Sequence, residues 1–71
     1  MIRFNVFGRL MVVERKSGEW LLYNDSPTGA RARVYDIVIP PDLPESSLGQ
    51  YLDDMYHELA TEKHPSVVRI I

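Results

Sequence analysis

The sequence of 71 residues contains no cysteine, so the fold can use neither disulfide bonds nor thiolate metal ligands. Its only histidines, His57 and His64, lie in no cluster of residues that could hold a structural metal ion. The sequence also lacks an apolar run of the roughly 20 residues that cross a bilayer, and its first residues lack the features of a signal peptide. We therefore expect a cytoplasmic protein without a metal ion or cofactor.

Basic residues are slightly fewer than acidic ones, and the two signs are unevenly distributed. The net charge is −2. Residues 1–40 carry six Lys and Arg against four Asp and Glu, whereas residues 41–62 carry six acidic side chains and no basic one. This distribution predicts a weakly basic sheet and an acidic helix.

The shortness of the chain limits its core, because a domain of about 60 residues buries only about 60% of the surface of its unfolded chain. With disulfides and metals excluded, self-association is the remaining common way to stabilise such a small domain. We expect residues 1–71 to form a single domain without an interior linker, and we favour a homodimer.

Apolar residues alternate with polar ones from residue 2 to residue 15, which is typical of a strand. Gly8 interrupts this pattern, so the segment is either one long strand bent at Gly8 or two short strands. Residues 16–19 predict a turn and residues 20–23 a second arm of a hairpin. After a loop of turn-forming residues, residues 31–39 predict a third strand that ends at two prolines.

A helix is expected next, starting between Asp42 and Ser47. Asp42 with Glu45 has the spacing of a capping box, and Ser46 or Ser47 is the alternative cap. The helix is defined by an apolar stripe at helical spacing: Leu48, Tyr51, Leu52, Met55, Tyr56 and Leu59.

Residues 67–71 leave room for one last strand. The expected fold class is α+β: an antiparallel sheet of three to four strands with one helix packed on one face, in the order βββα or βββαβ.

Carboxylates and a histidine gather on the predicted helix at Asp53, Asp54, His57 and Glu58. On a helical wheel His57 lies about 180° from the apolar stripe, where water surrounds it. Catalytic groups need a site that perturbs their pKa, and two possible ligands do not make a metal site. We interpret this face as solvated, with an acidic recognition surface as its functional alternative.

No other pattern predicts catalysis. The serines and threonines lie at turns, at helix boundaries or on polar faces, and none has a histidine close by in an apolar setting. The four glycines are scattered, so the chain contains no phosphate-binding loop. We expect no catalytic residue and no enzymatic activity.

Arginines and aromatic residues on the predicted sheet raise the possibility of nucleic-acid binding. The candidate residues are Arg3, Arg9, Arg31 and Arg33, with Phe7, Trp20 and Tyr35 as stacking rings. The acidic pI of about 5.5 argues against this function, because nucleic-acid modules are usually basic. We interpret the arginines as residues that keep an exposed or edge strand soluble.

Apolar residues also occupy the strand face opposite to the expected core: Phe7, Met11, Val13, Val34 and Val38. Pairing of two such faces, or of two edge strands, would bury this surface, whereas a core that extends around both faces is the alternative. The candidate partner-binding residues are Asp53, Asp54, His57, Phe7, Met11 and Trp20.

The sequence resembles a known family over essentially its whole length. The resemblance lies in residues 4–9 (FNVFGR) and residues 36–45 (DIVIPPDLPE), followed by Leu48 and residues 51–52. They resemble a family of bacterial proteins of about seventy residues with no assigned function. In kind the chain is also similar to short accessory proteins of mobile elements such as integron gene cassettes. The strand order is similar to that of some antitoxins. The resemblance implies strand, bend and cap positions and names no site residue.

The sequence therefore predicts a small, non-catalytic protein-interaction module with an accessory or regulatory role, for example as an antitoxin or immunity protein. A nucleic-acid-binding module that uses the arginines of the sheet is the alternative.

Overall fold

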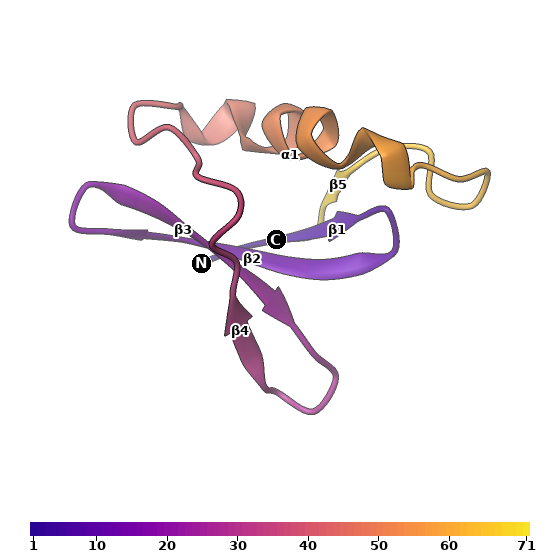
Figure 1. Ribbon diagram of the computed structural model, residues 1–71, viewed down its shortest axis with the longest axis horizontal. Coiled ribbons are helices and arrows are strands. Elements are labelled where there is room, and N and C mark those ends of the chain that lie inside the picture. The colour runs from indigo at the N-terminus through magenta and orange to yellow at the C-terminus, as the bar shows by residue number, and fades with distance from the viewer.

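The computed structural model describes residues 1–71 as a five-stranded antiparallel sheet with a helix across one face (Figure 1). The spatial order of the strands is β4-β3-β2-β1-β5, and the expected α+β class is confirmed. The elements are β1 (Ile2–Val6), β2 (Arg9–Lys16), β3 (Glu19–Asp25), β4 (Arg31–Arg33), the 3-10 turn η1 (Glu45–Ser47), α1 (Leu48–Tyr56), the 3-10 turn η2 (His57–Leu59) and β5 (Val68–Arg69).

Gly8 separates two strands instead of bending one. Phe7 and Gly8 form the two-residue turn between β1 and β2, and both have positive φ, 51° and 93°. Ser17 and Gly18 repeat this arrangement between β2 and β3 with φ of 51° and 76°. Positive φ at both residues is the requirement of the tight turns that suit the twist of paired strands. Both hairpins are therefore determined locally.

The first turn decides which residues of β2 face the core. It sets Phe4 opposite Met11 and Ile2 opposite Val13, so odd-numbered residues of β2 share a face with even-numbered residues of β1. Phe7 and Met11, expected on the exposed face, are only 7% and 1% exposed. That expectation was wrong because it assumed that the alternation of core-facing and outward-facing residues continues unchanged past Phe7 and Gly8. The two-residue turn reverses it, so that odd-numbered residues face the core in β2.

The core lies between the sheet and α1, and it is larger than the predicted one. Its buried side chains are Ile2, Phe4, Val6, Phe7, Met11, Val13, Leu22, Val34, Ile39, Leu48 and Leu52. Val13 and Val34 thus belong to the core too, and of the five apolar residues expected on the other face only Val38 is exposed.

The third strand is shorter than predicted, because β4 ends at Arg33 rather than at residue 39. Its last contact with the sheet is a 2.9 Å hydrogen bond from the Val34 amide to the Leu22 carbonyl. The chain from residue 34 to residue 44 then rises from the sheet to the helix layer (Figure 1). We call residues 34–44 the crossing segment.

Three side chains hold the crossing segment in place through its carbonyl groups. The Trp20 indole N–H donates to the Leu43 carbonyl at 2.9 Å, and Arg15 donates to the Pro41 carbonyl at 2.7 Å. From the helix, the Tyr51 hydroxyl donates to the Val38 carbonyl at 2.9 Å. These long-range hydrogen bonds explain why the crossing segment does not continue along the sheet.

The 3-10 turn η1 begins within the predicted window, and α1 follows directly after that window, at Leu48; it buries Leu48 and Leu52 completely. Neither predicted side-chain cap is formed. The chain enters α1 through a 3-10 turn in which the Ser47 amide donates to the Pro44 carbonyl at 2.9 Å, and Ser47 already has a helical backbone. The nine-residue α1 is too short to cross a bilayer, and no other helix approaches the required length.

The predicted last strand is present as β5, at the edge of the sheet beside β1. Phe4 lies opposite Arg69, so segments from the two ends of the chain are neighbours. The Val67 amide donates to the Asp53 carboxylate at 3.0 Å, and Arg69 forms an ion pair with Glu45 at 3.1 Å. These contacts attach the last residues to the helix layer.

Candidate functional site

The acidic residues predicted on the helix have different surroundings. One oxygen of the Asp53 carboxylate accepts the Val67 amide, and the other lies 3.3 Å from the His57 ring nitrogen Nδ1. Asp54 is exposed and accepts a hydrogen bond from the side-chain amide of Gln50. His57 points into solvent as predicted, with 72% of its side chain exposed. Asp53 therefore has a structural role, whereas Asp54 and His57 belong to the solvated face.

Both histidines contact the turn between β1 and β2. The Phe7 and His57 rings meet edge to face with centroids 6.3 Å apart. A methyl group added at Gly8 would lie 3.1 Å from the His64 ring. Neither histidine was expected at this turn, because His57 and His64 are far from Phe7 and Gly8 in the sequence. No three His, Asp or Glu side chains of the structure are grouped so that they could hold a metal ion.

Two of the four candidate arginines are held by a carboxylate on the uncovered face of the sheet. Arg3 and Arg31 lie 3.4 Å and 3.8 Å from the Asp25 carboxylate, which is only 7% exposed. Arg31 also contacts the sulfur of Met1. Val12 faces this side of the sheet yet is fully buried, which is consistent with these long side chains covering it.

Arg9 and Arg33 differ from this pair. Arg9 lies opposite Val6 and therefore shares the helix-bearing side of the sheet. Arg33 has no carboxylate partner, and its guanidinium lies 5.9 Å from the centre of the Tyr23 ring and 5.1 Å from that of Tyr35. Distances of this size are typical of cation–π contacts. The four arginines do not form one basic surface: Arg9 and Arg33, which form no ion pair, lie on opposite sides of the sheet.

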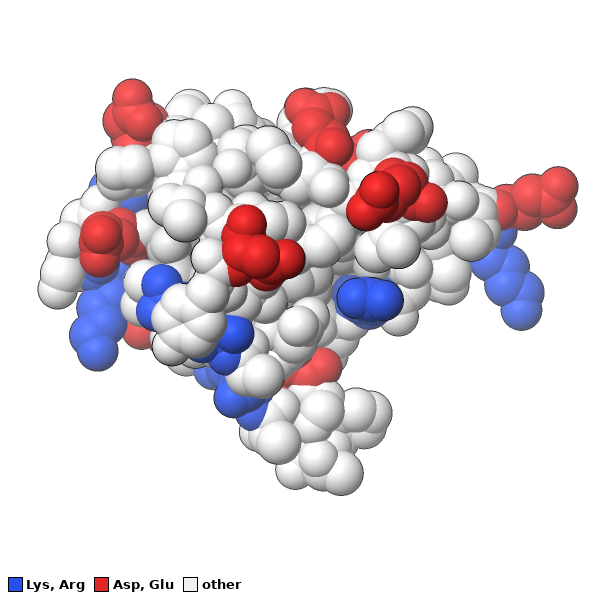
Figure 2. All heavy atoms as spheres, in the orientation of Figure 1, with Lys and Arg blue, Asp and Glu red and all other residues white.

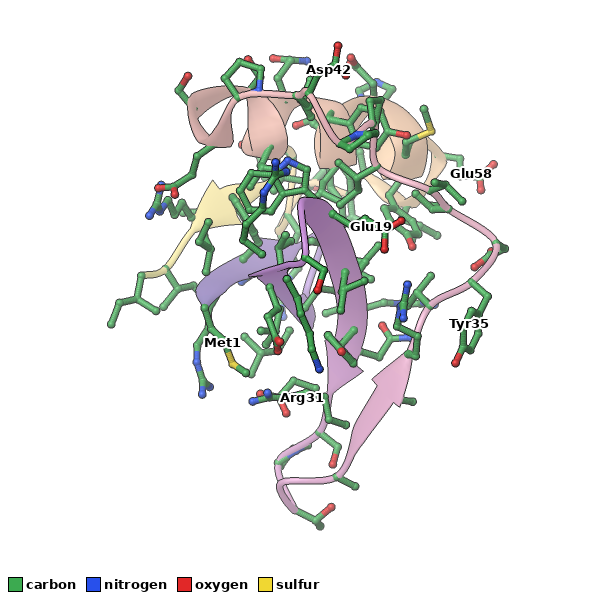
Figure 3. All side chains as sticks on the ribbon, turned by 90° about the vertical axis from the view of Figure 1, so that its left-hand side faces the viewer. Met1, Glu19, Arg31, Tyr35, Asp42 and Glu58 are labelled. Carbon is green, nitrogen blue, oxygen red and sulfur yellow. The ribbon has the colours of Figure 1, made fainter.

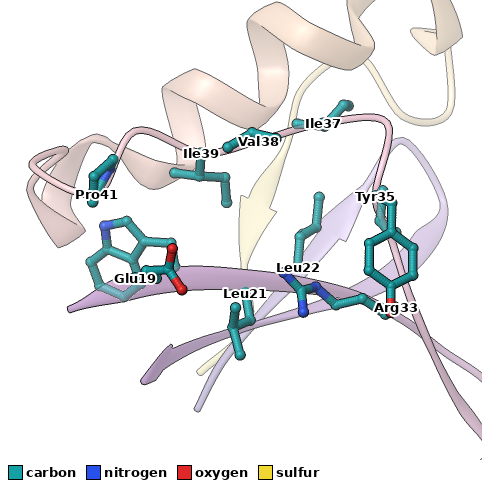
Figure 4. A pocket seen from close by; sticks show the side chains of 11 residues that line it. Glu19, Leu21, Leu22, Arg33, Tyr35, Ile37, Val38, Ile39 and Pro41 are labelled. Carbon is teal, nitrogen blue, oxygen red and sulfur yellow. The ribbon is translucent and has the colours of Figure 1, made fainter. Parts of the chain in front are cut away.

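A groove runs beside Arg33, between residues 19–22 of β3 and residues 33–41 (Figure 4). Its cavity has a volume of about 120 Å³, and eight of its 11 lining residues are hydrophobic. Leu22 points from β3 towards the crossing segment, and Leu21 points to the other side of the sheet (Figure 4). We call this feature the β3-edge groove.

The two most exposed large hydrophobic side chains of the protein border the β3-edge groove. Tyr35 is 76% exposed and Val38 is 78% exposed. Tyr35 projects away from the chain where the crossing segment leaves β4 (Figure 3). Apolar surface of this kind beside a hollow marks candidate interaction sites. The sequence predicted Val38 as surplus apolar surface and Tyr35 as a stacking ring. It did not predict a shared site for them, because residues 34–39 have the pattern of a strand, which places Tyr35 and Val38 on opposite faces.

Two charged side chains lie at opposite ends of the groove. Glu19 is at the end near Pro41, and Arg33 is at the other end, beside Tyr35 (Figure 4). Trp20, a predicted partner-binding residue, lines the groove, but its indole N–H is engaged by Leu43. The Arg15 guanidinium lies 4.7 Å from the centre of the Trp20 ring. Trp20 therefore shapes one wall of the groove.

The wider electrostatics separate the two layers of the molecule. Acidic side chains lie mainly over the helix-bearing half and basic side chains mainly below them (Figure 2). Tyr56 lies at the end of α1, where burial raises the pKa of its hydroxyl, the charge of Asp36 raises the pKa further, and Arg9 opposes both effects. The expected basic sheet and acidic helix are therefore present, although Asp25 neutralises part of the basic surface.

Two other hollows are less suited to binding a protein. One, between α1 and β5, is lined by nine residues of which two are hydrophobic. The other, beside Gly8 and Asn24, is lined by six residues of which one is hydrophobic. Both are wider and more open than the β3-edge groove, which combines apolar walls with oppositely charged ends.

Comparison with known proteins identifies a family and no characterised relative. No curated protein and no solved structure matches the chain. A family model described as a domain of unknown function, DUF7661, matches residues 1–71. The protein thus belongs to the DUF7661 family, whose domain spans the whole chain.

Proposed function

We propose that this protein is a non-catalytic interaction module that binds another protein at the β3-edge groove. The proposal rests on one observation: Tyr35 and Val38 are exposed beside an apolar hollow. Aromatic and arginine side chains are enriched in protein interfaces, and Arg33 stacked on Tyr35 supplies both. The sequence predicted Phe7 and Met11 as apolar contact residues, but both are buried in the core. The groove takes their place as the apolar contact surface in this proposal.

The arrangement of the arginines favours a protein over a nucleic acid as the partner. Phosphate binding needs several free cations on one surface. Arg3 and Arg31 are engaged by Asp25, and Arg9 lies on the other side of the sheet. On the uncovered face of the sheet, a nucleic acid would therefore meet Arg33 as the one candidate arginine that no carboxylate engages.

The biological setting is part of the proposal and rests on the resemblance described above. We propose a bacterial, cytoplasmic accessory or regulatory protein of the kind that mobile elements carry, with an antitoxin-like or immunity-like role as its concrete form. The family assignment groups the chain with proteins of unknown function and leaves this role open.

Photo-crosslinking in the cells that make the protein tests the groove directly. A photoreactive phenylalanine analogue replaces Val38 in one variant and Met55, which is 47% exposed on the helix, in the control variant. We expect the variant at position 38 to form one reproducible adduct with a protein, identified by mass spectrometry. The adduct should disappear when Arg33→Glu is added. Equal adducts from both positions, or adducts with nucleic acid, would refute the proposal.

The homodimer expected from the small size of the chain is a separate proposal, supported by a different surface. Val68 and Ile70, at the β5 edge, are 56% and 55% exposed. Pairing of two β5 edges would cover both residues. Sedimentation equilibrium tests it: Ile70→Glu should convert a dimer to a monomer, whereas a wild-type monomer at 100 micromolar, roughly 100 times a micromolar Kd, would exclude it.

A further inference from the structure

We infer that the β3-edge groove binds its partner as an extended segment that runs antiparallel to β3, with acidic side chains towards Arg33, one aliphatic side chain in the hollow, and basic side chains towards Glu19. This inference rests on the proposed function, because it specifies the partner chemistry of the same groove. Its basis is the free backbone of β3, the size of the hollow and the charges at its ends.

The backbone of Trp20 is available to an added strand. Lys16 and Glu19 form the pair that closes the two-residue turn, so hydrogen bonding to β2 alternates from there and the Trp20 N–H and C=O point away from β2. On the other side, β4 pairs only with residues 23–25, and the Val34–Leu22 hydrogen bond ends the contact. An extended peptide can bind this free edge through its main chain. Antiparallel pairing continues the pattern of the whole sheet.

The size of the hollow suits one side chain. Its volume of about 120 Å³ is close to that of an apolar cavity of about 150 Å³ that accommodates benzene. Ile37 and the exposed Val38 supply aliphatic surface to the hollow, whereas Leu22 and Ile39, only 2% and 3% exposed, contribute almost none. We therefore expect a leucine, isoleucine or methionine of the partner at this position.

The two ends of the groove set the order of charges in the bound segment. Neither Arg33 nor Glu19 forms an ion pair within the protein. The rings of Tyr23 and Tyr35 hold the Arg33 guanidinium beside the groove, which reduces the entropy lost when it binds a carboxylate. Because β3 runs from Glu19 towards the Arg33 end, an antiparallel segment presents its N-terminal part to Arg33. Acidic residues therefore precede the aliphatic residue, and basic residues follow it.

Fluorescence anisotropy with three labelled peptides tests this order. The first has the sequence Gly-Asp-Asp-Val-Leu-Val-Lys-Lys-Gly. The second exchanges its acidic and basic pairs, and the third replaces its three apolar residues with serine. We expect the first peptide to bind about tenfold more tightly than the second, a ratio that corresponds to about 1.4 kcal/mol. The third should not bind at millimolar concentration.

Variants of the protein assign this preference to the groove. The double variant Glu19→Lys, Arg33→Glu should reverse the preference between the first two peptides. Arg9→Glu, an exposed charge on the other side of the sheet, is the matched control and should leave the preference unchanged. Val38→Glu should abolish binding of the first peptide.

The outcomes separate this inference from the proposed function. Peptide binding that is abolished by Val38→Glu but shows no preference for charge order overturns the inference and leaves the groove as a protein-binding site. No peptide binding at millimolar concentration overturns the inference, and the crosslinking experiment then decides the proposed function alone. A wild-type dimer that Val38→Glu dissociates identifies a second copy as the occupant and also overturns the inference.

Discussion

Replacing Gly8 with alanine tests how the first hairpin and the C-terminal part of the chain meet. Gly8 has φ of 93°, a conformation that costs an L-residue about 1–2 kcal/mol. Alanine also restricts the unfolded chain, which offsets about 0.4–1 kcal/mol of this cost. The new methyl group lies 3.1 Å from the His64 ring, which must therefore move. We expect Gly8→Ala to lower the free energy of unfolding by about 2 kcal/mol, the additional cost being the disturbed His64 packing.

Gly18 provides the matched control, because it occupies the same place in the second two-residue turn. Its φ is 76°, and a methyl group there would meet no atom within 4 Å. Gly18→Ala should therefore cost only the backbone component, about 1 kcal/mol. In a domain of this size 1 kcal/mol shifts Tm by about 4–8 °C, so the two variants are distinguishable by thermal and urea unfolding followed by circular dichroism.

A double-mutant cycle with His64→Ala isolates the contact. In the His64→Ala background, Gly8→Ala should cost about as much as Gly18→Ala, because the ring that the methyl group meets is gone. If the two glycine variants are equally unstable in the wild-type background, the His64 ring does not lie on the turn and the reasoning is refuted.

Three further predictions concern the helix and its attachments. Leu52→Ala should cost about 2–5 kcal/mol, since Leu52 is fully buried, whereas Met55→Ala on the exposed face should cost under about 0.5 kcal/mol in urea unfolding. Asp53→Ala should destabilise the attachment of β5 by about 1–3 kcal/mol and speed hydrogen exchange at the Val67 amide, with Asp54→Ala unchanged as control. The raised pKa of Tyr56 favours its protonated form in the folded state, so this contribution to stability is complete below the ordinary tyrosine pKa of 10.0 and is lost as the pH rises through the higher folded value. Ultraviolet titration should show one late-titrating tyrosine that Tyr56→Phe removes; its persistence in that variant would contradict the assignment.

The parts of the fold that depend on neighbouring residues were predictable from the sequence. The turn at Gly18 and the amphipathic helix after Ser47 follow from local patterns, whereas the sequence only left room for the last strand, which pairs with β1 at the other end of the chain. Gly8 was ambiguous because glycine fits both a bend within a strand and a turn between strands. This ambiguity reversed the facing of every residue in β2, because side chains alternate with a period of two.

The candidate site depended on contacts that the sequence does not reveal. Residues 34–39 have the composition of a strand, but Trp20 and Tyr51 hold the crossing segment away from the sheet through hydrogen bonds that span 23 and 13 positions. The resulting short β4 leaves the groove open and places Tyr35 and Val38 at its border. Arg33, Tyr35 and Val38 are close together in the sequence. This short cluster is the part of the site that sequence patterns alone could have indicated.

The pairing of β5 with β1 has a consequence for how the molecule folds. The three hairpins from β1 to β4 join near neighbours in the chain, so they can form early and at small entropic cost. The β1–β5 pair joins segments nearly the whole chain apart, and it is short: two ladder pairs and the backbone hydrogen bonds between Arg3 and residues 70–71 hold it. We therefore expect this ladder to form after the folding transition state, so that substitutions at its contacts accelerate unfolding and leave the folding rate almost unchanged.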